Sequence, residues 1–172
     1  DAQESRGLGD VYKRQYQHRQ GEYMNILYTA FKGKYNASNY LIAGMQGDTL
    51  SDNSFQELER DIASIDEHYD AVLMFGVAPE LRDTVRVETC ALYIGEYITT
   101  DFEIEALTCG LQSCGIPCFV SDKPTAYLCN AAYYHMLKRI PGSVFVHIPS
   151  IQYMNTAMME KLSVFLSRNP WQ

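Results

Sequence analysis

The sequence predicts an α/β protein, a three-layer α/β/α sandwich around a largely parallel, mixed central sheet. Short apolar runs typical of buried strands alternate along the chain with segments whose apolar residues recur at a helical period. The chain has 172 residues, of which 47% are hydrophobic, and this is enough for one domain with its own core. Strands that alternate with helices usually form a parallel sheet covered by helices on both faces.

The elements follow one another in a regular order. The expected strands are short apolar or alternating runs, and they cover 24–31, 49–50, 69–75, 85–93, 116–120 and 144–148. The expected helices carry apolar residues mainly on one side, and they cover 38–45, 54–68, 101–113, 128–140 and 155–166. Sites in such sheets lie at the carboxyl ends of strands. Phe31, Gly76 and His147 all fall at expected ends, so we expect the site there.

Composition excludes several classes of function. A net charge of −7 argues against a nucleic-acid-binding protein, which needs a basic face. No apolar run approaches the roughly 20 residues of a membrane span. The first 25 residues contain no apolar stretch of a secretion signal, so the odd set of five cysteines is interpreted as reduced thiols in a cytoplasmic protein. The sequence does not decide oligomeric state, and a homo-oligomer is compatible with it.

The beginning of the chain is unlike the rest. Residues 1–15 show no apolar periodicity and resemble the translation of a sequencing adapter. The alternative is an ordinary disordered tail. We therefore treat residues 1–20 as a non-native or disordered tail and expect residues 24–168 to form a single domain.

Cys129 is the candidate nucleophile. It falls near the start of an expected helix, where the positive end of the helix dipole favours a thiolate. His147 interrupts an apolar strand near its end, and this position favours it as the base that takes the thiol proton. A satisfied core histidine is the alternative. His18, His68 and His135 are weaker candidates, because they lie in the tail, at a polar helix end and on another side of the Cys129 helix.

A third group should orient the histidine, and Glu88 is the candidate. It stands in a strand between apolar residues, where the alternative is a carboxylate paired with Arg86 or Arg82. A metal site is not expected: Cys109, Cys114 and Cys118 lack the paired spacing of zinc ligands and are interpreted as buried thiols.

Four blocks of the sequence resemble the pyroglutamyl peptidase I (pyrrolidone-carboxylate peptidase) family of cysteine peptidases. The blocks come in the family order, and they are 27–38, 75–91, 127–134 and 145–149. The resemblance implies removal of N-terminal pyroglutamate (5-oxoproline) from peptides, without a metal or other cofactor. It places the catalytic cysteine on Cys129, the histidine on His147 and the glutamate on Glu88. Residues 24–168 would then be a catalytic domain whose partner is a peptide beginning with pyroglutamate.

The resemblance also implies a substrate pocket. Its ring-binding aromatic residues map to Phe31 and Tyr127, with Asn36 ordering the loop beneath and Val77 standing where many members have glutamine. We expect Phe31 and Tyr127 to flank an apolar slot beside Cys129. For these two rings the alternative is ordinary core packing, and for Asn36 it is a helix cap or turn.

The chain departs from the family in the covering segments. Thr89 and Tyr93 replace an arginine and an asparagine, and only 41 positions separate Glu88 from Cys129, fewer than in most members. Three interpretations remain: a shortened pyroglutamyl peptidase, a related cysteine amidohydrolase acting on another small amide, and a non-catalytic relative that serves as a binding domain.

Overall fold

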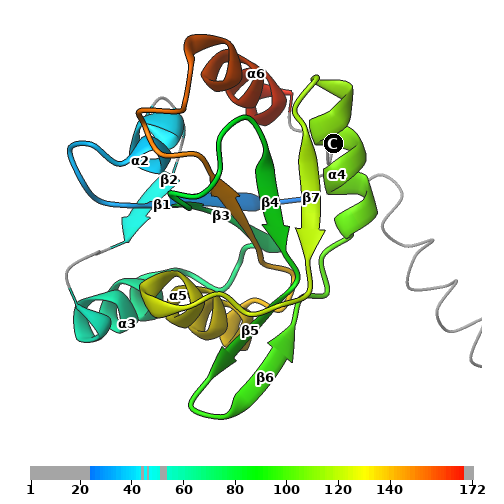
Figure 1. Cartoon of the computed structure of the whole chain (residues 1–172). Coiled ribbons are helices and arrows are strands. Elements are labelled where there is room, and N and C mark those ends of the chain that lie inside the picture. Colours follow the sequence, from blue (N-terminus) through cyan, green and yellow to red (C-terminus); the bar gives the residue numbers. More distant parts are fainter. Residues whose placement is uncertain (1–23, 44, 46, 51–53, 169–172) are drawn as a thin grey trace, which may run out of the picture.

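The computed structural model describes residues 24–168 except 44, 46 and 51–53. The expected tail at residues 1–20 lies outside the described residues. The strands, shown in Figure 1, are β1 (Ile26–Phe31), β2 (Gly47–Leu50), β3 (Ala71–Val77), β4 (Val85–Glu88), β5 (Cys90–Tyr93), β6 (Glu96–Thr99), β7 (Cys118–Ser121) and β8 (Val144–Ile148). The helices are α2 (Ala37–Ile42), α3 (Phe55–Ser64), α4 (Ile104–Ser113), α5 (Tyr127–Arg139) and α6 (Thr156–Ser167).

The central sheet has six strands in the order β2-β1-β3-β8-β4-β7. The four strands β2, β1, β3 and β8 run parallel to one another. Strand β4 pairs antiparallel with β8, and β7 is parallel to β4. The expectation of a largely parallel, mixed sheet is therefore confirmed. The carboxyl ends of β1, β3 and β8 lie at one edge of the sheet, as predicted for Phe31, Gly76 and His147.

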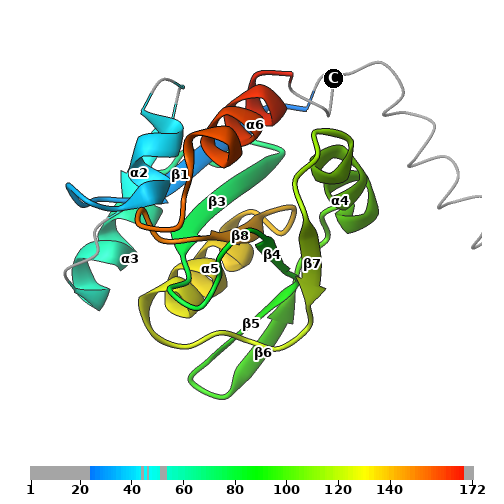
Figure 2. The ribbon, with the colours of Figure 1, turned by 45° about the horizontal axis from the view of Figure 1, so that its top comes forward.

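Helices cover both faces of this sheet, and the three layers are visible in Figure 2. Helices α2, α4 and α6 pack on one face, where Leu41, Leu107 and Leu162 join the apolar side chains of the strands. Helices α3 and α5 pack on the other, where Leu58 and Met136 belong to the second core cluster. We call the second face the α5 face. None of the described helices is long and apolar enough to cross a membrane.

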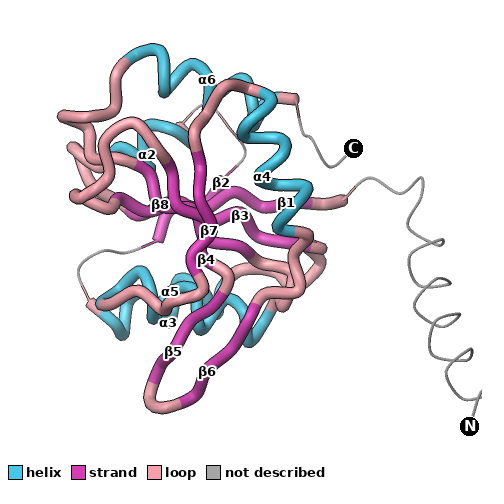
Figure 3. The backbone as a smooth tube through the Cα atoms, turned by 45° about the vertical axis from the view of Figure 1, so that its right-hand side comes forward, coloured by secondary structure: helices cyan, strands magenta, loops and turns pink. Residues whose placement is uncertain are grey.

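The segment expected as one strand over 85–93 is two strands, and this prediction was wrong. The ladder breaks at Thr89, whose backbone N–H and hydroxyl both donate to the carbonyl of Ser121. Beyond Thr89 the chain leaves the sheet and forms the hairpin β5–β6, which projects from the α5 face in Figure 3. The hairpin turns at Ile94 and Gly95, with φ angles of 50° and 78°. A tight turn with two positive φ values usually carries Asn-Gly. Because Ile94 stands where asparagine is usual, the sequence did not signal this turn.

The turn yields a prediction. Ile94 is 88% exposed and β-branched, so little packing offsets the steric cost of its positive φ. Ile94→Asn should stabilise the protein by about 1 kcal/mol, measured as a higher urea midpoint. Ile94→Val keeps the β-branch and is the matched control, with no gain expected. Equal midpoints for Ile94→Asn and the parent would contradict strain at this turn.

Candidate active site

The candidate residues reach one face of the sheet through simple alternation. Val85 and Val87 of β4 point into the α2/α4/α6 core, as do Val146 and Ile148 of β8. Successive side chains of a strand point to opposite faces. The intervening residues of the two strands, Arg86, Glu88, Phe145 and His147, are therefore on the α5 face.

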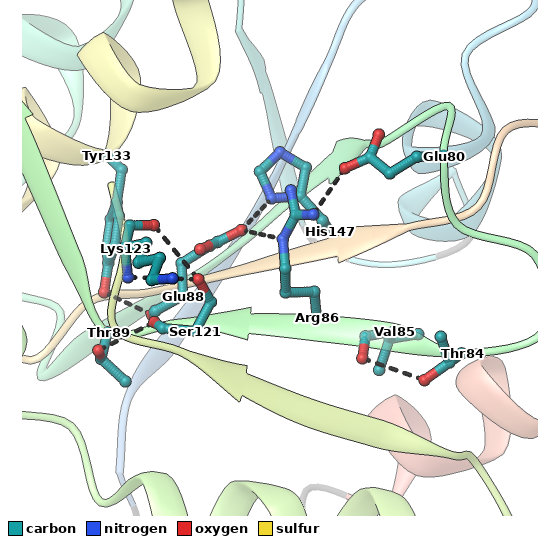
Figure 4. Close-up of polar contacts among 10 residues, drawn as sticks. All are labelled: Glu80, Thr84, Val85, Arg86, Glu88, Thr89, Ser121, Lys123, Tyr133 and His147. Carbon is teal, nitrogen blue, oxygen red and sulfur yellow. Dashed lines mark hydrogen bonds and ion pairs between the residues drawn. The ribbon is translucent and has the colours of Figure 1, made fainter. Parts of the chain in front are cut away.

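Glu88 and His147 form a buried pair. The distance between Nδ1 of His147 and Oε1 of Glu88 is 2.7 Å, and the two side chains are 4% and 2% exposed. Figure 4 shows the carboxylate directed at the ring. In the antiparallel register Glu88 stands opposite Phe145, so it reaches His147 diagonally. A carboxylate on Nδ1 favours the tautomer whose Nε2 is free to accept a proton.

Arg86 is a third member of this group that sequence inspection assigned only to the non-catalytic alternative. It stands directly opposite His147, and its Nε donates to the same Glu88 Oε1 at 2.6 Å. Its Nη1 donates to Oε1 of Glu80 at 2.6 Å. Burial alone would lower the pKa of Arg86, but the bonds to Glu88 and Glu80 outweigh it and the pKa is raised. Glu88 thus binds an arginine and a histidine at the same time.

Cys129 lies at the carboxyl edge of the sheet on the α5 face. A methyl group built on Gly76 would lie 3.3 Å from Cys129 Sγ, and Gly76 is paired with His147 in the β3–β8 register. The thiol is therefore next to the strand positions that hold His147. The structure has no hydrogen bond between these two described side chains, which is common for catalytic contacts without substrate.

Burial raises the pKa of Cys129 to about 11, and the charge of Glu88 acts in the same direction. The backbone N–H of Cys129 and the charge of Arg86 lower the pKa of the thiol but do not compensate. The expected dipole effect on the thiolate is thus outweighed by desolvation in this state. An acceptor for the thiol proton is required, and Nε2 of His147 is the candidate.

The start of α5 is unusual. Tyr127, its first residue, has a φ of 64°, and Ala126 before it provides no side-chain cap. A non-glycine residue at this φ costs on the order of 1–2 kcal/mol, and such strain gathers at functional sites. The first-turn N–H groups, including that of Cys129, lack a capping side chain and are suited to an oxyanion.

Asn130 fixes the hairpin to this helix start, and sequence inspection missed it. Its side-chain amide accepts from the Leu92 N–H at 3.0 Å and donates to the Leu92 carbonyl at 2.6 Å. The amide therefore continues the backbone pairing of β5. An asparagine beside a candidate nucleophile was the available signal, but its partner became visible only with the hairpin.

The residues expected to bind substrate are not all together. Phe31 is buried on the α5 face, with its ring 6.3 Å from that of Phe145. Tyr127 is 87% exposed. Asn36 caps α2 by accepting from the Ser38 N–H. The Val77 side chain packs in the core of the opposite face, so only its backbone can face a substrate beside Cys129.

The other candidate bases and thiols lie elsewhere. His68 pairs with Asp66 at 3.0 Å and His135 with Glu59 at 3.3 Å, whereas His18 is outside the described residues.

All five cysteines are free thiols. The expectation that Cys109, Cys114 and Cys118 are buried was wrong. Cys109 is exposed and the other two are only partly buried, because their positions on α4, at its C-terminal end and on the edge strand β7 are covered on one side only.

Asn130→Ala should loosen the hairpin. Loss of both bonds leaves the backbone groups of Leu92 without this partner, at a cost of about 1–3 kcal/mol in the free energy of unfolding. Hydrogen exchange at the Leu92 N–H should accelerate at least tenfold. Asn155→Ala, which removes the cap bond to Met158 of α6, is the control and should leave Leu92 exchange unchanged. Unchanged exchange at Leu92 in Asn130→Ala would contradict the role of Asn130 in fixing the hairpin to α5.

Gly76→Ala tests the position of the thiol. The added methyl would lie 2.6 Å from Cζ of Phe145 and press on Cys129, so we expect a loss of about 1–3 kcal/mol and slower alkylation of Cys129. Gly110→Ala places a methyl 2.9 Å from Phe165 in the other core. This control should lose stability with Cys129 alkylation unchanged. Equal alkylation rates in both variants would place Cys129 away from Gly76.

Comparisons with known proteins agree with the resemblance read from the sequence. No protein-family model matches the chain. The pyrrolidone-carboxylate peptidase of Vibrio vulnificus is 27% identical, over an alignment that covers 55% of this chain and 57% of that protein. The chain thus spans little more than half the length of the curated relatives it matches.

Solved structures show the same fold. The crystal structure of pyrrolidone carboxyl peptidase from Thermus thermophilus matches with a TM-score of 0.66 and 20% identity, covering 84% of this chain and 98% of that one. The enzyme from Thermococcus litoralis matches with a TM-score of 0.70 and 17% identity, covering 86% and 93%. The predicted similarity to pyrrolidone-carboxylate peptidases is confirmed, and the fold is theirs.

Proposed function

We propose that this protein is a cysteine peptidase that removes N-terminal pyroglutamate from peptides, with residues 24–168 as its catalytic domain. The observation that carries the proposal is the buried Glu88–His147 pair on the sheet face where Cys129 lies in the first turn of α5. Similarity of the chain and of its fold to pyrrolidone-carboxylate peptidases supports the same activity. In this proposal Cys129, His147 and Glu88 are the catalytic residues.

The chemistry follows from the roles of these groups. Nε2 of His147 takes the thiol proton, and Cys129 Sγ attacks the carbonyl carbon that joins pyroglutamate to the next residue. The N–H groups at the start of α5 stabilise the oxyanion. His147 then gives its proton to the leaving amine, the C–N bond breaks, and a thioester remains. Water hydrolyses the thioester by the same route in reverse, and Glu88 stabilises the imidazolium throughout.

The proposed substrate contacts are apolar and backbone contacts. A lactam ring has no charge, so recognition depends on flat apolar surfaces and on hydrogen bonds to its N–H and C=O. Phe31 would pack against the ring, Tyr127 would close over it from the surface, and the backbone of Val77 would bond to it. Asn36 would hold the loop after Phe31 through its cap on α2.

A second function is favoured by one observation. Phe31 is buried, whereas Tyr127 is 87% exposed, so core packing holds only the Phe31 side of the proposed slot. A cysteine amidohydrolase acting on a different small amide would retain the same catalytic group with an altered slot. We propose a cytoplasmic location for either enzyme, because the nucleophilic thiol must stay reduced. A homo-oligomer is compatible with both.

Hydrolysis of a chromogenic pyroglutamyl amide tests the proposal. We expect detectable turnover with a high KM and competitive inhibition by 2-pyrrolidone. Cys129→Ala should reduce kcat by roughly 10³-fold or more, and Glu88→Gln by roughly a hundredfold, because the imidazole loses its partner. The control is Cys109→Ala, an exposed thiol on α4, which should keep full activity.

Each other outcome has a defined meaning. Hydrolysis that survives Cys129→Ala would refute the nucleophile. Hydrolysis of another small amide that depends on Cys129, without turnover of the pyroglutamyl amide, would establish the second function. No turnover of any amide, together with alkylation of Cys129 no faster than that of Cys109, would leave a binding domain.

A further inference from the structure

We propose that Arg86 is a positioning residue that sets the pH range in which the Cys129–His147 pair works, by sharing the carboxylate of Glu88 with His147. This inference rests on the proposed function, in which Cys129 is the nucleophile and His147 is the base. It concerns a residue outside the proposed triad.

The sheet register brings Arg86 to this place. In the antiparallel pair β4–β8, Arg86 stands directly opposite His147 and Glu88 stands two residues farther along the same face. Nε of Arg86 and Nδ1 of His147 both contact Oε1 of Glu88, at 2.6 and 2.7 Å. The second oxygen, Oε2, is buried and has no partner in the part of the chain that the structure describes. Arginine and histidine therefore compete for one oxygen, as Figure 4 shows.

The charges around His147 come from three elements. Strand β4 contributes Glu88 and Arg86, helix α5 contributes the thiol of Cys129, and the loop before β4 contributes Glu80. Arg86 is largely buried, with 17% of its side chain exposed, whereas the Glu80 side chain is 58% exposed. Among the described residues, Glu88 is thus hydrogen-bonded to one permanent cation, the guanidinium of Arg86, and to the ring of His147.

This cation has a defined electrostatic effect. It offsets the negative charge of Glu88, which acts against a thiolate on Cys129. It also favours the thiolate directly, since the charge of Arg86 lowers the pKa of Cys129 whereas burial and the charge of Glu88 raise it. The thiol consequently loses its proton at a lower pH than it would beside Glu88 alone.

The sign of the expected change follows. Without Arg86, the thiolate of Cys129 is stabilised less, so the pKa of the thiol rises. The pH profile of thiol reactivity should therefore move upward as a whole. A residue that only held the β3–β4 loop through Glu80 would change the rate at every pH and leave the midpoint in place.

The experiment follows the rate of Cys129 alkylation by iodoacetamide from pH 5 to 10, located by peptide mass spectrometry on the full chain. Arg86→Met should raise the midpoint by roughly one pH unit, which is about tenfold slower alkylation on the acid side. Arg86→Lys retains the charge and should move the midpoint by less than half as much. The matched control is Arg82→Met, which removes a cation from the same loop. The Arg82 guanidinium stacks on Tyr153, and its loss should leave the midpoint unchanged.

Glu80→Gln gives a test that does not depend on the folding of the Arg86 variants. Loss of this partly exposed carboxylate leaves the charge of Arg86 less compensated, so the midpoint should move to lower pH, by less than the Arg86→Met shift and less still at high salt. Unshifted midpoints in folded Arg86→Met, or an upward shift in Glu80→Gln, would overturn the inference.

The proposed function is judged separately by hydrolysis of the pyroglutamyl amide. If the alkylation midpoints move as expected but no pyroglutamyl amide is cleaved, the substrate assignment fails and the role of Arg86 stands. If cleavage depends on Cys129 but neither the alkylation nor the hydrolysis profile moves in Arg86→Met, the role of Arg86 fails and the function stands.

Discussion

The antiparallel pairing of β4 with β8 assembles the candidate active site of this protein. In an otherwise parallel sheet, β4 enters beside β8 in the opposite direction, and its register puts Arg86 across from His147 and Glu88 across from Phe145. A slip of one residue would exchange the faces, placing Val85 and Val87 near His147 and both charged side chains in the α2/α4/α6 core. Because that core accepts only apolar side chains, it holds β4 in the register that keeps Arg86 and Glu88 on the α5 face.

Burying the Glu88 carboxylate costs free energy, and the polar partners of Glu88 offset this cost. Glu88 is 1% exposed as a residue, and a carboxylate at such a position requires partners. His147 and Arg86 meet this requirement on Oε1, while the backbone carbonyl of Glu88 accepts from the buried hydroxyl of Tyr133 at 3.0 Å. The same desolvation raises the pKa of the Cys129 thiol to about 11, so the proposed reaction needs a base. Reactivity thus depends on the balance between Glu88 and Arg86, not on the dipole of α5 alone.

Sequence patterns predicted most of the strands and helices because each of these elements is recognisable from its own residues. Apolar runs ending at Gly76 and at His147 need no partner to be recognised, and Asn155 marks the start of its helix by residue type. The hairpin β5–β6 was missed because its turn has Ile94 where asparagine would have been informative. Arg86 and Asn130 were underestimated for a related reason. The importance of each depends on a partner about 40 to 60 residues away, His147 and Leu92 respectively, and only strand order and register bring those partners close.

The slot proposed to bind the substrate shows how far the fold constrains the proposed function. Phe31 ends β1 and packs toward Phe145, so one wall is fixed by the core that holds His147. Tyr127 sits instead at a strained helix start and is open to solvent, where no described core contact holds its ring. A wall fixed by packing changes little between relatives, whereas a wall made by an exposed ring can change without loss of stability. Under the proposed function, the identity of the amide would therefore depend mainly on the side of the slot where Tyr127 stands.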